Sequence, residues 1–293
     1  MPKIFIHIGL PKTATSTLQM DVFPKINTSK ITYLGINEPR ENIQNPIFSF
    51  FMKSIYSGIE VDYIKHLLAE ELKKGKNLLI SEEMIVVGDW KQKILNLARI
   101  IKDFDYQLII TVREPAEAMF SYYVELYHIF KKEKLTFYDT AIYNDYMKIF
   151  YYKCFIQHLL KYFEKDRINI FKFEEIIKGN ILGIEKVLSI SQNFEIQNNN
   201  FRKKTSKYVR RHQDRRITNI LSNTLIFRKL IFLLKDSFLK PVLKRLFHLF
   251  DFLKIVKRTK INKPSVPELQ SLRLILKDET SYLSDEFGIQ YLD

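Results

Sequence analysis

The amino-acid sequence predicts a three-layer α/β fold, in which helices flank a central, mainly parallel sheet and a helical segment lies near the C-terminus. Short apolar runs rich in β-branched residues recur along the chain, as expected of buried strands. Longer stretches with helical periodicity separate them, and this alternation is typical of βαβ units with a parallel sheet. A length of 293 residues, 46% of them hydrophobic, is enough for one large domain.

The predicted strands are all short. They cover Lys3–Ile8, Ile31–Leu34, Asn77–Ile80, Gln107–Val112 and Ile168–Phe171. The predicted helices are an opening turn at Ala14–Met20, then Val61–Lys74, Lys91–Ile101, Pro115–Phe130, Phe137–Phe163 and a last helix from near Ser265 to Gly288. Ligands of parallel sheets bind beyond the carboxyl ends of the strands. A functional site is therefore expected at the turns after Ile8, Ile80 and Val112.

The amino-acid composition of the chain changes after residue 190. Residues 202–216 are strongly basic, and residues 217–260 combine apolar helical runs with lysine and arginine, interrupted by Pro241. Basic amphipathic helices can lie in a membrane interface with their lysines toward anionic headgroups. Residues 1–293 are interpreted as one domain with a basic, apolar helical insertion at about 217–260. This insertion either packs on the domain or makes a peripheral contact with an anionic membrane.

The net charge of +14, from 47 Lys and Arg against 33 Asp and Glu, predicts an anionic partner. Nucleic acid, a phosphorylated nucleotide, an acidic glycan and an anionic membrane all fit this charge. A nucleic-acid-binding protein is the alternative from a different functional class. It is disfavoured because the basic residues form no recognition helix and no aromatic RNA-binding motif.

The cysteine and histidine residues limit which disulfides and metal sites the chain can contain. The single cysteine, Cys154, excludes an internal disulfide framework, and its apolar surroundings predict a buried structural thiol. The histidines show no metal-ligand spacing, so no metal is expected. The N-terminal apolar run is too short for a signal peptide, and no uninterrupted apolar stretch reaches the roughly 18 residues of a membrane span. The expected location is cytoplasmic, with any peripheral contact at the inner membrane face.

A hydroxyl-rich turn, Gly9-Leu10-Pro11-Lys12-Thr13-Ala14-Thr15-Ser16-Thr17-Leu18, follows the first predicted strand. A helix N-terminus presents unpaired N–H groups and the positive end of the helix dipole to anions, and Lys12 adds a full charge. The turn therefore predicts a site for a phosphate-like group. A Walker loop would need Gly-x-x-x-x-Gly-Lys-Ser/Thr. Here Pro11, which has no N–H, precedes Lys12, so a nucleotide kinase, the alternative enzyme, fits poorly.

A second candidate lies where the strand Gln107–Val112 runs into Arg113-Glu114-Pro115 and a helix carrying Ser121. Pro115 at the first helical position, with Glu114 before it, indicates a helix start. A guanidinium such as that of Arg113 can hold a phosphate through two parallel hydrogen bonds. Ser121 lies about 12 Å farther along the helix axis. Arg113 and Ser121 are therefore expected to touch one phosphate only if the chain between them bends around it.

The two motifs, Pro11-Lys12-Thr13-x-Thr15-Ser16-Thr17-Leu18 and Arg113-x-Pro115 followed by Ser121-x-Tyr123, resemble those of sulfotransferases that use 3′-phosphoadenosine-5′-phosphosulfate (PAPS). The resemblance implies a P-loop-like fold and transfer of a sulfuryl group to a hydroxyl or amine, with 3′-phosphoadenosine-5′-phosphate (PAP) as product. It also implies a carbohydrate or glycolipid acceptor, as in bacterial and Golgi carbohydrate sulfotransferases.

The same resemblance implies roles for individual residues. Lys12 would contact the bridging and sulfuryl oxygens, and Arg113 and Ser121 would hold the 3′-phosphate. The residues expected to hold the 5′-phosphate are consecutive: Thr13, Ala14, Thr15, Ser16 and Thr17. The family usually has glycine at the position of Ala14, which is therefore expected to have helical backbone angles here.

An acidic pair, Glu82-Glu83, follows the strand Asn77–Ile80. Carbohydrate-type sulfotransferases place a glutamate base at about this point, so the resemblance implies that Glu83, or else Glu82, is the catalytic base. Acidic residues that cap a helix are the alternative interpretation. His128 is the reserve candidate for the base. His7 lies inside the first predicted strand and is expected to be a packed core residue.

Overall fold

The structure is a computed structural model that describes residues 2–26, 28–35, 45–130, 135–190, 209–211, 258–261 and 263–291. The chain divides into two compact units, one of residues 1–206 with 264–293 and one of residues 207–263. In the second unit, β6 (Val209–Arg211) pairs antiparallel with β7 (Arg258–Lys260). Most of the helical insertion predicted at about 217–260, with the membrane contact expected of it, lies outside the described residues. Its last three residues form the strand β7, so the prediction of a helix is wrong there.

The first unit is built on a five-stranded sheet in the order β2-β3-β1-β4-β5, in which all neighbouring strands are parallel. The strands are β1 (Ile4–Gly9), β2 (Ile31–Tyr33), β3 (Asn77–Ser81), β4 (Tyr106–Val112) and β5 (Ile168–Lys172). The five predicted strands are therefore confirmed. Every residue of β1 is buried because this strand lies in the middle of the sheet.

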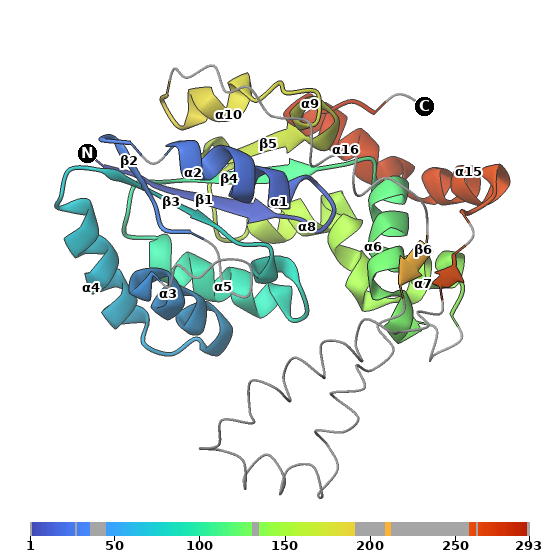
Figure 1. Ribbon diagram of the computed structural model, residues 1–293, viewed down its shortest axis with the longest axis horizontal. Coiled ribbons are helices and arrows are strands. Elements are labelled where there is room, and N and C mark those ends of the chain that lie inside the picture. Colours follow the sequence, from blue (N-terminus) through green and yellow to red (C-terminus); the bar gives the residue numbers. More distant parts are fainter. Residues whose placement is uncertain are drawn as a thin grey trace, which may run out of the picture. The chain divides into compact units, whose positions relative to one another are not determined.

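Helices cover both faces of the sheet (Figure 1). One face is covered by α1 (Thr15–Thr17), η1 (Leu18–Val22), α2 (Phe23–Ile26), α9 (Phe173–Ile176) and α10 (Leu182–Val187). Apolar side chains of η1, α2, α9 and α10 form one core cluster with Phe5, Leu79 and Ile109 of the sheet. The other face carries α3 (Pro46–Ser57), α4 (Val61–Leu72) and α5 (Trp90–Ile101). The predicted three-layer α/β fold is confirmed.

The remaining helices of the first unit come after β3, between β4 and β5, and after β7. They are η2 (Met84–Val86), α6 (Pro115–Phe130), α7 (Phe137–Tyr143), η3 (Asp145–Phe150), α8 (Tyr152–Leu159), η4 (Lys165–Arg167), α15 (Val266–Ile275) and α16 (Lys277–Phe287). Within the described ranges, no helix combines the length and the apolar composition needed to traverse a bilayer.

Two predicted helices are broken into shorter ones. The stretch predicted as Phe137–Phe163 is interrupted at Asn144, whose side chain accepts a hydrogen bond from the Tyr146 N–H and so starts η3. The last predicted helix begins as expected, with a capping box between Ser265 and Glu268. It is interrupted at Leu276 between α15 and α16. Helical periodicity continues through such breaks, so it does not locate them.

The prediction for Cys154 is wrong, because this cysteine is exposed. The buried residues of α8 are Tyr152, Phe155, Ile156 and Leu159, and position 154 falls outside that stripe of the helix. The prediction for His7 is confirmed. His7 is fully buried, its Nδ1 lies 2.7 Å from Ser81 Oγ, and burial lowers its pKa to about 3.

Candidate active site

The three turns singled out in the sequence lie side by side, because they follow three adjacent parallel strands. β1 lies between β3 and β4, with His7 paired to Ser81 and Gly9 to Thr111. Since the carboxyl ends of parallel strands meet at one edge of a sheet, Lys12 and Arg113 come from neighbouring turns there. The Glu82-Glu83 pair follows the third of these strands.

Internal hydrogen bonds hold the turn after β1. Thr13 Oγ1 donates to Leu10 O at 2.7 Å and lies 2.7 Å from Thr111 Oγ1 on β4. Thr15 Oγ1 also donates to Leu10 O, at 3.1 Å. Because both threonine side chains are buried, their hydroxyls shape the turn, and backbone N–H groups are what they can offer a ligand. Ser16 and Thr17 are half-buried.

The turn contains two residues in the left-handed region, Lys12 at φ 68° and Ala14 at φ 70°. The expectation of helical backbone angles at Ala14 is therefore wrong, because Ala14 lies one residue outside the helix, as its N-cap. A left-handed conformation costs a residue with a Cβ about 1–2 kcal/mol. Gly9 is required for a different reason, since a Cβ there would overlap the Thr15 side chain.

Ala14→Gly is expected to raise the free energy of unfolding by about 0.5–1 kcal/mol. Glycine removes the left-handed strain of about 1–2 kcal/mol, less about 0.4–1 kcal/mol for the greater freedom of the unfolded chain. Urea unfolding followed by circular dichroism measures the change. Ala98→Gly, within α5, is the matched control and should lower stability by about 1 kcal/mol or more. Equal destabilisation by both substitutions would contradict the left-handed conformation at position 14.

Both candidate cations form ion pairs with carboxylates of α6. Lys12 Nζ lies 2.5 Å from Glu125 Oε2, and Arg113 Nη2 lies 3.6 Å from Glu117 Oε2. Residues spaced by four share one face of a helix, so Ser121 lies between Glu117 and Glu125 on that face. The turn after β1 and the turn after β4 thus meet on α6, one helical turn to either side of Ser121.

The expected bend between Arg113 and Ser121 is not in the backbone, because α6 is continuous from Pro115 to Phe130. The Arg113 guanidinium is instead paired with Glu117 at 3.6 Å. Glu117 precedes Ser121 by about one turn, roughly 6 Å along the helix axis. The glutamates spaced by four around Ser121 are visible in the sequence, and that spacing is a signal that could have revealed the two ion pairs.

Two aromatic residues position Arg113, and neither was predicted. Tyr152, fully buried, accepts a hydrogen bond from the Arg113 N–H at 3.2 Å and donates to the Arg113 carbonyl at 2.6 Å. The Arg113 guanidinium lies 4.6 Å from the centre of the Phe173 ring, a cation–π contact. Burial raises the pKa of Tyr152 above its ordinary value, so its hydroxyl stays protonated and can donate.

The two acidic candidates differ in environment. Glu82 is buried, and its Oε1 accepts a hydrogen bond from the Met84 N–H at 2.9 Å. Glu83 is half-buried at the start of η2. Burial, followed by the negative charges of Glu83 and Glu125, raises the pKa of Tyr122 on α6, so these carboxylates lie near its hydroxyl. His128 belongs to α6, but its side chain lies outside the described part of the structure.

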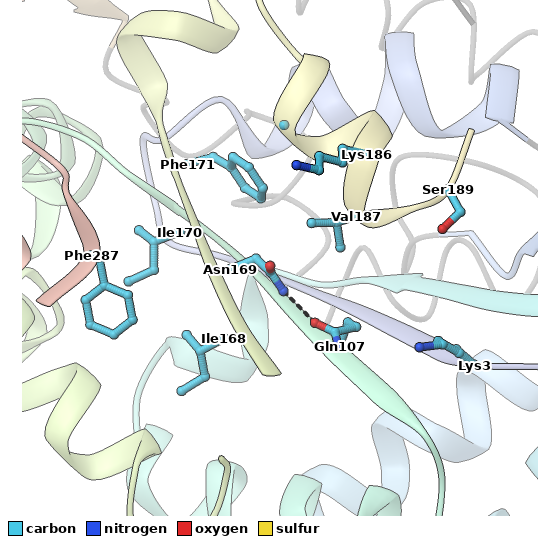
Figure 2. Close-up of a pocket in the computed structure, with 11 residues that line it drawn as sticks. Lys3, Gln107, Ile168, Asn169, Ile170, Phe171, Lys186, Val187, Ser189 and Phe287 are labelled. Atoms are coloured by element: carbon cyan, nitrogen blue, oxygen red, sulfur yellow. Dashed lines mark hydrogen bonds between the residues drawn. The ribbon is translucent and has the colours of Figure 1, made fainter. Parts of the chain in front are cut away.

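Two cavities of the first unit lie in different places relative to the carboxyl ends of the strands. A cavity of about 580 Å³ runs along the edge strand β5 (Figure 2). Lys3 and Gln107, at the amino ends of β1 and β4, also line it, so it extends away from Lys12 and Arg113. A smaller cavity of about 320 Å³ is lined by Val86, Tyr122 and residues of η3. Val86 follows the Glu82-Glu83 pair in the chain, at the end of η2.

No protein-family model matches this chain, and no curated protein matches it. Solved structures that are similar to it include two that are named as sulfotransferases. One is a sulfotransferase from Alicyclobacillus acidocaldarius, with 12% identity, a TM-score of 0.48, and coverage of 100% of this chain and 97% of that chain. The other is the sulfotransferase domain from the curacin biosynthetic pathway, with 13% identity, a TM-score of 0.41, and coverage of 94% and 98%. Both are sulfotransferases. At this identity and these scores neither assigns a role to any residue here, so roles depend on the chain's own geometry.

Proposed function

We propose that this protein is a sulfotransferase that moves a sulfuryl group from PAPS to a hydroxyl or amine, with a carbohydrate or glycolipid as the acceptor. One observation carries the proposal. The turn with Lys12 and the turn with Arg113 meet on one face of α6, on either side of Ser121. Two anion-binding motifs that are far apart in the sequence would thereby serve the two ends of one nucleotide.

The residues fit a donor with two separate phosphate groups. The 5′-phosphosulfate would lie at the start of α1, against Lys12, Ser16 and Thr17, and the 3′-phosphate would lie between Arg113 and Ser121. The two ion pairs are partly exposed, and such pairs contribute little free energy. A bound phosphate can therefore replace Glu117 and Glu125 as the partner of each cation at low cost.

Sulfuryl transfer in this site would need charge stabilisation and one base. The acceptor oxygen or nitrogen attacks the sulfur, and the bond from sulfur to the bridging phosphate oxygen breaks. The electron pair of that bond goes to the phosphate of PAP, where Lys12 stabilises the negative charge that develops. The acceptor proton goes to Glu83. Glu83 is preferred to Glu82 because the Glu82 carboxylate is buried and already caps η2.

Arg113→Ala is expected to weaken PAP binding by about 10- to 150-fold, the loss of about 1.5–3 kcal/mol that follows from removing a charged hydrogen-bond donor. Glu117→Gln is the matched control. It removes the carboxylate partner of Arg113 but keeps the guanidinium, so PAP should bind at least as tightly as to the wild type. Isothermal titration calorimetry with PAP measures both variants.

The same calorimetry with ATP distinguishes the alternative functions. A sulfotransferase should bind PAP much more tightly than ATP, because ATP has no 3′-phosphate for Arg113 and Ser121. Equal affinity for ATP would refute the 3′-phosphate assignment and favour the nucleotide kinase. Tight binding of oligonucleotides, with no preference for PAP, would favour a nucleic-acid-binding protein.

A further inference from the structure

The cavity of about 320 Å³ beside α6, here called the η3 pocket, has a consistent chemical character. Three of its walls are aromatic: Trp90 at the start of α5, Tyr122 on α6 and Tyr146 on η3. Val86, Val87, Gly88 and Ile149 complete the apolar lining, and the charged residue among those that line it is Asp145. The lining, as far as the structure describes it, includes no lysine or arginine.

Packing fixes two of the three aromatic walls, Trp90 and Tyr122, in place. Trp90 is 6% exposed and contacts Phe155 and His158, with ring centroids 5.4 and 5.0 Å away. Tyr122 is 4% exposed and packs edge-on against Phe150 at 5.7 Å. Tyr146, 40% exposed, contacts Phe130 at 6.3 Å. Rigid aromatic walls with a few polar groups are typical of small-molecule pockets, and the volume, near the lower end of about 300–1,000 Å³, suits one ring.

The η3 pocket adjoins the groups proposed to act in transfer. Val86, in its wall, donates its N–H to the Glu83 carbonyl at 3.2 Å. Tyr122 directly follows Ser121 and lies one helical turn before Glu125, the partner of Lys12. The wall of the pocket is therefore continuous with the turn that carries Glu83 and with the helix that carries Ser121 and Glu125.

We propose, on the basis of the proposed function, that the η3 pocket binds the acceptor and selects an uncharged, hydroxyl-bearing ring of the size of one hexose. The C–H face of a sugar ring packs on aromatic side chains, and its hydroxyls can hydrogen-bond to the tyrosine hydroxyls and to Asp145. A carboxylated or already sulfated ring would instead place a negative charge near Asp145. Like charges at short range are unfavourable, so acidic glycans are poor acceptors for this site.

Trp90, the single tryptophan of the chain, allows a test that needs no turnover. Wild-type protein, with PAP present, is titrated with methyl β-glucoside, with methyl β-glucuronide and with phenol, and Trp90 emission is followed. We expect a saturable change with the glucoside in the millimolar range and at least tenfold weaker binding of the glucuronide. Asp145→Asn should bring the affinity for the glucuronide closer to that for the glucoside. Tyr146→Ala should weaken binding of the glucoside at least fivefold.

Several outcomes would overturn the proposal. They are equal binding of glucoside and glucuronide, binding of phenol alone, and no response to any of the three ligands. Unchanged glucoside affinity in Tyr146→Ala would show that the sugar binds elsewhere. Calorimetry with PAP on the same samples tests the donor site separately. Selective glucoside binding without PAP binding would therefore refute the proposed sulfotransferase function while leaving the η3 pocket as a sugar site.

Discussion

Lys12→Ala is expected to reduce the rate of sulfuryl transfer by about 10²- to 10³-fold, the effect of removing one preorganised group that stabilises charge in a transition state. Lys12 would act on a charge that develops as the sulfur–oxygen bond breaks, so the loss should appear in kcat. The affinity for PAP should fall by less than about tenfold, since partly exposed ion pairs contribute little free energy. Transfer of ³⁵S from labelled PAPS measures the rate, and calorimetry measures the affinity.

Lys25→Ala is the matched control for the loss of one positive charge. Lys25 lies in α2, follows the same N-terminal turn and is exposed, so its substitution should leave transfer unchanged. Glu125→Gln separates the ion pair from the catalytic role, because it releases Lys12 without removing its charge. If Lys12→Ala retained full kcat, Lys12 would have no part in stabilising the leaving phosphate.

Glu83→Gln is expected to reduce turnover by about a hundredfold or more, the usual effect of removing a general base, while PAP binds as before. The amide keeps the size of the carboxylate but cannot take the proton of the acceptor. The acceptor for this assay is chosen from sugars that bind the η3 pocket. The rate of transfer at a saturating concentration of PAPS gives kcat, which does not depend on the affinity for PAPS.

Glu82→Gln distinguishes catalysis from structure at the same turn. Glu82 is buried and accepts the Met84 N–H, so this variant should lose stability in urea unfolding, and any loss of turnover should follow the loss of folded protein. A fully active Glu83→Gln, together with an inactive Glu125→Gln, would move the base to α6. Full activity in all three variants would leave His128 as the next candidate.

The sequence by itself was sufficient to locate the strands and the two turns that follow β1 and β4. Buried parallel strands are continuous apolar runs, and their ends are marked by Gly9 and by Arg113 before Pro115. These signals lie within a few consecutive residues, so they can be recognised without knowledge of the fold. The ends of the helices were less predictable, because breaks at Asn144 and Leu276 interrupt a periodicity that continues on both sides.

Three features depended on tertiary structure. The order β3-β1-β4 brings the three turns to one edge, and strand order is a property of the whole sheet. The left-handed Ala14 lies in a turn that contacts a distant strand, since Thr13 Oγ1 lies 2.7 Å from Thr111 Oγ1 on β4. Tyr152, 39 residues from Arg113 in sequence, orients that arginine's backbone.

The aromatic η3 pocket depended on tertiary structure in the same way. Its walls come from α5, α6 and η3, which are separated in sequence. A sequence specifies the side chains, and its local patterns predict the helices and strands that carry them. Which side chains meet is decided by the packing of those elements, because contacts between distant residues leave no periodic signal in one sequence.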